Sequence, residues 1–83
     1  MADHTPLLLL NLADRIDQFP HAAMTQKLVE AQALNVAEAM YGPGAYSEQI
    51  EHHLLTQVPP IRPGDTRGEY AARLRLMATG AAV

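Results

Sequence analysis

The 83-residue chain contains no cysteine and no tryptophan, and it has one phenylalanine and three tyrosines. Without cysteine it forms no disulfide, no iron–sulfur cluster and no zinc site with thiolate ligands. A chain of this length buries only about 60% of its unfolded surface, so its own core gives a marginal stability. We therefore expect a single domain that gains stability by burying surface against a partner.

A long apolar run and a basic N-terminal segment are also missing. The apolar run of residues 7–13 is interrupted by Asn11 and followed by Asp14, Arg15 and Asp17, and it is far too short to cross a bilayer. A secretory signal would begin with basic residues, and a helix lying on a membrane would carry several Lys or Arg side chains on its polar face. We expect a cytoplasmic protein that does not interact with a membrane.

What the sequence has in abundance is helix-forming residues. Hydrophobic residues make up 48% of the chain, charged residues only 18%, and most of the apolar residues are Ala and Leu, the strongest helix formers. Apolar spacing and Gly or Pro breakers predict four helices, at residues 6–18, 22–41, 48–58 and 67–77. The expected fold is all-α, a compact four-helix arrangement with short breaker-rich loops, and the fourth helix follows a Pro-rich connector at residues 58–64. Residues 1–78 form the one domain, and residues 79–83 form a frayed tail.

Cap residues mark most of these helix ends. The segment Thr66–Glu69 has the spacing of a capping box, in which the Thr and Glu side chains satisfy each other's backbone amides. Gly42 followed by Pro43 predicts a sharp end for the second helix. Thr5 and Ser47 are the expected N-caps of the first and third helices. Thr25 is an alternative N-cap inside the second helix.

Four consecutive leucines, Leu7, Leu8, Leu9 and Leu10, stand at the start of the first predicted helix. Successive helical residues point about 100° apart, so these side chains cover more than one face. A surface helix of a monomer needs a single apolar stripe. The first helix is therefore either buried on several sides or keeps one side for a partner, and we expect at least one leucine outside the core.

Two tyrosines, Tyr41 and Tyr46, flank the Gly-Pro-Gly corner between the second and third helices. They either close the end of the core or form a rigid aromatic binding tip, because Tyr combines a large apolar ring with a polar hydroxyl.

The residues available for catalysis and metal binding are sparse. His52 and His53 are adjacent, so they point about 100° apart and do not have the i, i+4 spacing of a zinc-binding helix. Ser47 is the single serine and lies where an N-cap is needed, without the Gly-x-Ser-x-Gly context of a nucleophile elbow. We expect no enzyme activity, no metal site and no cofactor.

The charge of the chain is uneven. Its net charge is −3, with −5 over residues 1–61 and +2 over residues 62–83, where four arginines are found: Arg62, Arg67, Arg73 and Arg75. These arginines support an alternative function, a DNA-binding regulator, which predicts that they gather on one exposed face. Nucleic acid is nevertheless not the expected partner, because the chain is acidic overall and the third helix carries Glu48 and Glu51 without Lys or Arg.

The sequence favours a small non-catalytic protein–protein interaction module, an adaptor, regulator or assembly protein of the size common in bacteria and phages. The expected partner is another protein chain, either a host factor or a second copy in a homodimer held by the first helix. The candidate partner-binding residues are Leu7, Leu8, Leu9, Leu10, Tyr41, Tyr46, Arg62, Arg67, Arg73 and Arg75.

Overall fold

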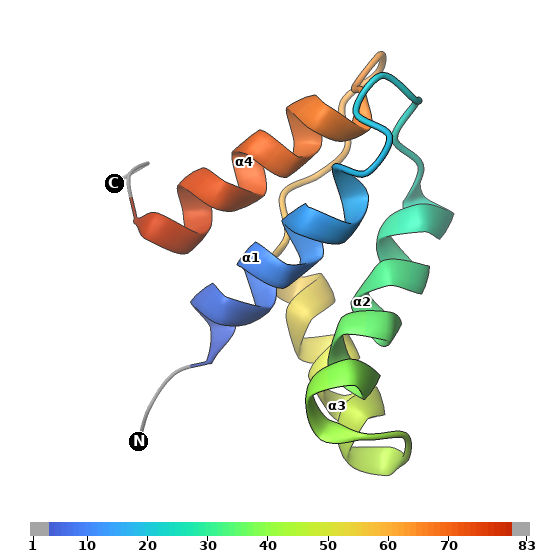
Figure 1. Cartoon of the computed structure of the whole chain (residues 1–83), viewed down its shortest axis with the longest axis vertical. Helices are drawn as coiled ribbons and strands as arrows, with labels where there is room; N and C mark the ends of the chain where they lie inside the picture. The colour runs from blue at the N-terminus through green and yellow to red at the C-terminus, as the bar shows by residue number, and fades with distance from the viewer. Residues whose placement is uncertain (1–3, 81–83) are drawn as a thin grey trace.

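A computed structural model describes residues 4–80 as four helices without a strand, which confirms the expected all-α four-helix fold. The helices are α1 (Thr5–Ile16), α2 (Gln26–Tyr41), α3 (Ala45–Gln57) and α4 (Arg67–Thr79). In Figure 1, α2 and α3 form an antiparallel pair on one side of α1, and α4 runs antiparallel to α1 on the other side. Each of the other three helices contacts α1. The leucine-rich helix is thus the centre of the bundle.

The core gathers around α1. It contains five α1 residues together with side chains from α2, α3, α4 and the loop before α2, and its largest fully buried members are Tyr70, Leu8, Leu12, Ile16, Leu54 and Leu74. Phe19 is 66% exposed, because α1 ends at Ile16 and Phe19 therefore does not continue the buried face of Leu8 and Leu12.

The loop between α1 and α2 is held by the start of α4. Backbone amides of Gly68 and Arg67 donate to the carbonyls of Pro20 and Ala22, and the amide of Met24 donates to Asp65. Because these backbone groups are bonded to Asp65 and to the first two residues of α4, the helix does not begin at residue 22. The start predicted at Ala22 is therefore wrong, and Thr25 is the N-cap, accepting a hydrogen bond from the amide of Leu28.

Two other predicted caps are wrong. The N-cap of α1 is His4, without a side-chain cap bond, and Thr5 is the first helical residue. The N-cap of α3 is Gly44, with a positive φ of 136°, while Ser47 is buried inside the helix and its hydroxyl donates to the Gly44 carbonyl. Since α3 begins at Ala45, three residues earlier than predicted, the corner between α2 and α3 is very short.

The predicted end of α2 and the predicted start of α4 are confirmed. Gly42 ends α2 with a φ of 78°, and the capping box of Thr66 and Glu69 is formed at the start of α4. The end of α4 lies beyond the predicted Met77, because Thr79 is helical and Gly80 forms a left-handed C-cap. Thr79 is therefore not part of a frayed tail, and residues 81–83 of that predicted tail lie outside the described residues.

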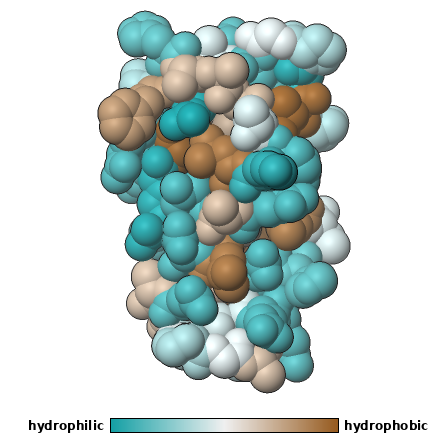
Figure 2. Space-filling model, turned by 90° about the vertical axis from the view of Figure 1, so that its right-hand side faces the viewer, coloured by the Kyte–Doolittle hydropathy of each residue, from teal (hydrophilic) through white to brown (hydrophobic). Residues whose placement is uncertain are grey.

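The outer surface of α2 is an ordinary solvated helix face. Figure 2 looks at the molecule from this side and shows apolar atoms in separate patches among hydrophilic ones. Polar side chains pair with each other along the helix, as Gln26 does with Glu30 and Asn35 with Gln32. Such pairs are typical of a face that contacts water. The exposed leucines lie instead on α1 and α4.

Candidate functional site

The leucine run divides between the core and the surface. Leu8 and Leu9 are buried in the core, whereas 49% of Leu7 and 37% of Leu10 are exposed. Leu7 and Leu10 are three residues apart, so they lie on the same face of α1, opposite the side chains that enter the core. We call the surface formed by these two leucines the α1 outer face.

Asp14 lies one turn beyond Leu10 on the same side of α1, and it marks the border with α4. Its carboxylate accepts a hydrogen bond from Arg75 at 3.0 Å, and Asp17 accepts a second one from the same guanidinium at 2.9 Å. Both carboxylates raise the pKa of Arg75. Arg75 therefore joins α4 to α1, and its charge is already compensated by two carboxylates.

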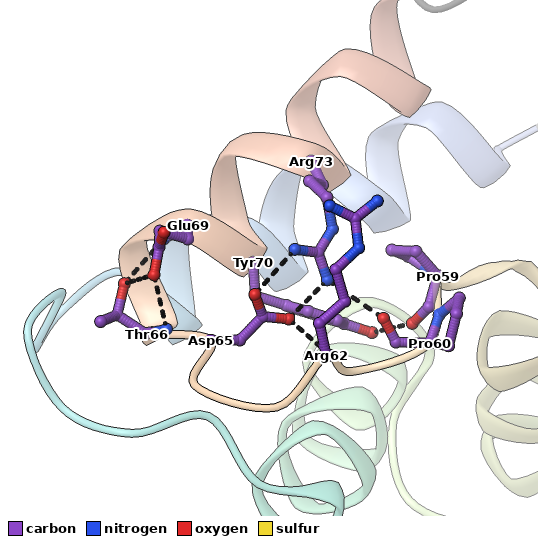
Figure 3. A network of polar contacts seen from close by, with 8 residues as sticks. All are labelled: Pro59, Pro60, Arg62, Asp65, Thr66, Glu69, Tyr70 and Arg73. Carbon is purple, nitrogen blue, oxygen red and sulfur yellow. Dashed lines mark hydrogen bonds and ion pairs between the residues drawn. The ribbon is translucent and has the colours of Figure 1, made fainter.

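Arg73 makes a second ion pair on the opposite side of α4. Its two terminal nitrogens donate to the two carboxylate oxygens of Asp65 at 3.0 and 2.7 Å, and one of them also donates to the Pro60 carbonyl at 3.0 Å. Figure 3 shows this arrangement, in which the connector runs beside α4 and Asp65 faces Arg73. A planar guanidinium that binds a carboxylate through two parallel bonds is a geometrically specific pair.

The connector is fixed by further bonds. The hydroxyl of the buried Tyr70 donates to the Pro59 carbonyl at 2.7 Å, and burial raises the pKa of this tyrosine to about 12. Asp65 also accepts the backbone amide of Arg62 at 2.7 Å, and its bonds to Arg73 and Arg62 lower its pKa to about 2. The guanidinium of Arg73 lies 5.2 Å from the Tyr70 ring centroid, within the range of a cation–π contact.

The four arginines do not form one exposed basic face. Arg67 donates from Nε to the Ala23 carbonyl at 3.3 Å, and Arg73 and Arg75 bind carboxylates on opposite sides of α4. Within residues 4–80, no ion pair involves the exposed Arg62. The DNA-binding alternative requires a gathering of arginines that this arrangement does not provide.

A groove of about 210 Å³ lies between the connector and α4. Its lining is mostly apolar, with two arginines at its edge, and consists of Pro59, Pro60, Leu76, Met77, Arg62 and Arg73. Leu76 is 51% exposed and Met77 is 39% exposed. We call this feature the connector groove.

Only Arg62 and Arg73 of the connector groove were among the sequence-predicted site residues. Met77 lies on the same line of α4 as the buried Tyr70 and Leu74, but it is exposed. The signal in the sequence that could have revealed the groove is Leu76, an apolar residue of the fourth helix that lies outside the line of Tyr70, Leu74 and Met77.

Tyr41 and Tyr46 meet at the corner between α2 and α3. Their rings are perpendicular, with centroids 5.2 Å apart, and Tyr46 is exposed while Tyr41 packs against the core. One tyrosine thus closes the end of the core and the other forms the outer side of the corner. Together they border a shallow hollow of about 170 Å³ lined also by His4, Thr5, Leu8, Ile50 and His53.

The hollow also contains a polar contact between α3 and the start of α1. Nε2 of His53 lies 3.2 Å from the Thr5 hydroxyl, and residues 4–80 contain no group of three His, Asp or Glu side chains placed to hold a metal ion. Within the same residues, no helix is long and apolar enough to cross a membrane. The features with the clearest capacity to bind are the α1 outer face and the connector groove, and both are apolar.

Comparisons with protein-family models, with curated proteins and with solved structures gave no significant match for this chain.

Proposed function

We propose that this protein is a small non-catalytic interaction module that associates with a second copy of itself through the α1 outer face. The observation that carries the proposal is the position of Leu7 and Leu10, two large apolar side chains exposed next to each other on the central helix. In this role the protein would serve as an adaptor, regulator or assembly factor, and its working form would be a homodimer.

The energetics favour an association of this kind. Fully burying one leucine side chain contributes roughly 1.5–3 kcal/mol. In a two-fold dimer the same patch is used by both copies, so four partly exposed leucines would meet across the axis. Asp14 lies beside this patch, and its ion pair with Arg75 reduces the charge that a dimer contact would bring close to the leucines.

The arginines support a structural role in this scheme. Arg73 and Arg75 form ion pairs that attach the connector and α1 to α4, which makes them less available to phosphates. A DNA-binding regulator would rely on cations that are free to exchange their counterions for phosphate. The function proposed for Arg73 and Arg75 is therefore the fixing of α4, and the apolar faces are the contact surfaces.

The test is light scattering of the full chain over a wide concentration range. We expect a mass approaching twice the 9.0 kDa of one chain, and a return to monomer in Leu7→Lys and Leu10→Lys, because a charged side chain on this face cannot be buried in a dimer. Circular dichroism should show both variants folded. Leu8→Lys and Leu9→Lys should unfold the chain instead, since each places a charge in the core.

Leu76→Lys is the matched control, because Leu76 is exposed to the same extent as Leu7 but belongs to α4. It should leave the association unchanged. A parent protein that remains monomeric at high concentration would refute the proposal, as would Leu7→Lys and Leu10→Lys variants that stay dimeric.

A further inference from the structure

The connector groove carries features that self-association through α1 leaves unexplained. Leu76 and Met77 are consecutive in α4, and both expose a substantial part of their side chains beside the rings of Pro59 and Pro60. Apolar surface gathered in a hollow with a polar rim is characteristic of a contact site.

The connector side of the groove is held in place by hydrogen bonds within the chain. The carbonyl of Pro59 accepts a bond from Tyr70, the carbonyl of Pro60 accepts one from Arg73, and Asp65 is held at three points. The two prolines also have restricted backbones and no amide hydrogen to donate. A partner would therefore bind without ordering the connector first, which removes one of the usual costs of association.

The size of the groove favours a side chain over a metabolite. Its volume of about 210 Å³ is below the 300–1,000 Å³ typical of pockets that enclose a small-molecule ligand. A strand of a partner could not pair with the backbone of Pro59 and Pro60, because proline has no amide hydrogen to donate. Recognition would depend on a large apolar side chain placed against Leu76 and Met77, with a polar contact at the rim.

The rim is positively charged. Both oxygens of Asp65 already accept bonds from Arg73, and one of them also accepts the Arg62 amide. Figure 3 shows the side chains of Arg62 and Arg73 extending on the same side of the connector. Among residues 4–80, no carboxylate forms an ion pair with Arg62. The charge of Arg62 therefore remains available for an anionic group of a partner.

We propose that the connector groove binds an acidic segment of another protein, with an apolar side chain of that segment seated on Leu76 and Met77 and a neighbouring carboxylate paired with Arg62. This site is separate from the α1 outer face, so it does not depend on self-association, and the protein would join its own dimer to a second partner. Guanidinium groups suit carboxylates because they can donate two parallel hydrogen bonds.

The test begins with selection of short random peptides displayed on phage against the full chain. We expect enrichment of peptides in which Asp or Glu lies close to Leu, Ile, Met or Phe. A labelled synthetic peptide of that consensus should then bind with an affinity that falls about tenfold or more in Arg62→Glu and in Leu76→Ser, measured by fluorescence anisotropy. Both residues are exposed, so the variants should keep the parent's circular dichroism spectrum.

Leu7→Lys is the matched control, because it alters the α1 outer face and should leave peptide binding unchanged. The proposal is overturned if no acidic–apolar peptide is enriched, or if the selected peptides bind Arg62→Glu and Leu76→Ser as well as the parent. It is also overturned if a DNA duplex displaces the peptide by binding Arg62, because the rim of the groove would then be a phosphate-binding site. Light scattering of the same samples measures their oligomeric state, so a loss of peptide binding can be distinguished from a loss of self-association.

Discussion

Arg73 and Arg75 are two residues apart in the chain, yet they hold different parts of the molecule. Two steps of 100° bring the side chains to nearly opposite sides of α4, where Arg73 meets Asp65 of the connector and Arg75 meets Asp14 and Asp17 of α1. The Arg73 pair is the less exposed of the two, since 8% of the Asp65 side chain is accessible compared with 74% for Asp14. Exposed ion pairs contribute little to stability, so the Arg73 pair should matter more.

Acid should weaken the fold through Asp65. Its pKa is about 2 in the folded chain and 3.8 ordinarily, so the unfolded chain binds the proton first as the pH falls. The free energy of unfolding should therefore decrease as the pH falls from about 4 through 2, and the lowered pKa of Glu69 acts in the same direction. Urea unfolding over this pH range measures the effect.

Asp65→Asn is the informative variant in that experiment. It should be less stable than the parent at neutral pH, and the difference should shrink as the parent's own carboxylate becomes protonated. Asp14→Asn removes an exposed carboxylate from the other ion pair of α4 and should leave the acid dependence in place. An unchanged pH profile in Asp65→Asn would show that the Arg73 pair does not stabilise the fold.

At the scale of the helix, α4 is the element whose start is most firmly specified by local sequence. The amide of Glu69 donates to the Thr66 hydroxyl at 3.2 Å, and the Thr66 amide donates to the Glu69 carboxylate at 3.0 Å. These two bonds satisfy amides that a helix leaves without partners at its N-terminus. The same Thr66 also forms an isolated bridge with Ala23, so the cap lies at the junction with the loop before α2.

Thr66→Ala should lower the free energy of unfolding by about 1 kcal/mol, because an amide of α4 loses its acceptor. Glu69→Ala should also be destabilising, and the two effects should not add, since each substitution removes the partner of the other. A double-mutant cycle on urea unfolding measures this coupling. Strict additivity would contradict reciprocal capping, and Thr79→Ala, at the far end of α4, provides a comparison for the loss of a threonine hydroxyl.

At the scale of the whole molecule, α4 docks by its N-terminal end as well as by its apolar face. The amide of Gly68 donates to the Pro20 carbonyl at 2.9 Å, and a Cβ added to Gly68 would lie 2.9 Å from the Pro20 Cβ and 3.2 Å from that carbonyl oxygen. The ring and backbone of proline cannot move aside easily. A residue with no side chain is therefore required where α4 crosses the loop after α1.

Gly68→Ala should be destabilising, by about 1–3 kcal/mol, although alanine is the better helix former by about 1 kcal/mol. The added methyl group would push α4 away from the loop and weaken the bonds to Pro20 and Ala22. Thermal and urea unfolding measure the change, and Ala72→Gly, at an exposed position of the same helix, measures the propensity term alone. A stabilised Gly68→Ala would show that α4 and the loop are not in close contact.

Local sequence patterns determined the number of helices and several of their ends. The Thr66–Glu69 spacing, Gly42 with Pro43, and the alternative N-cap at Thr25 each act within a single turn, so their chemistry is complete in the nearby residues. The four consecutive leucines likewise required that apolar side chains lie on several faces of α1. The predicted N-cap at Ser47 is wrong because this side chain is buried inside α3. The predicted start at Ala22 is wrong because backbone hydrogen bonds hold this loop against the start of α4.

Only the tertiary structure decided which leucines remain outside and what the arginines do. Leu7 and Leu10 are chemically identical to Leu8 and Leu9, and their exposure depends on where α2, α3 and α4 pack around α1. Arg75 meets Asp14 across 61 residues of sequence, and Tyr70 meets Pro59 only because the connector folds back along α4. Contacts of this kind depend on the relative positions of whole helices, and no periodicity within one segment encodes those positions.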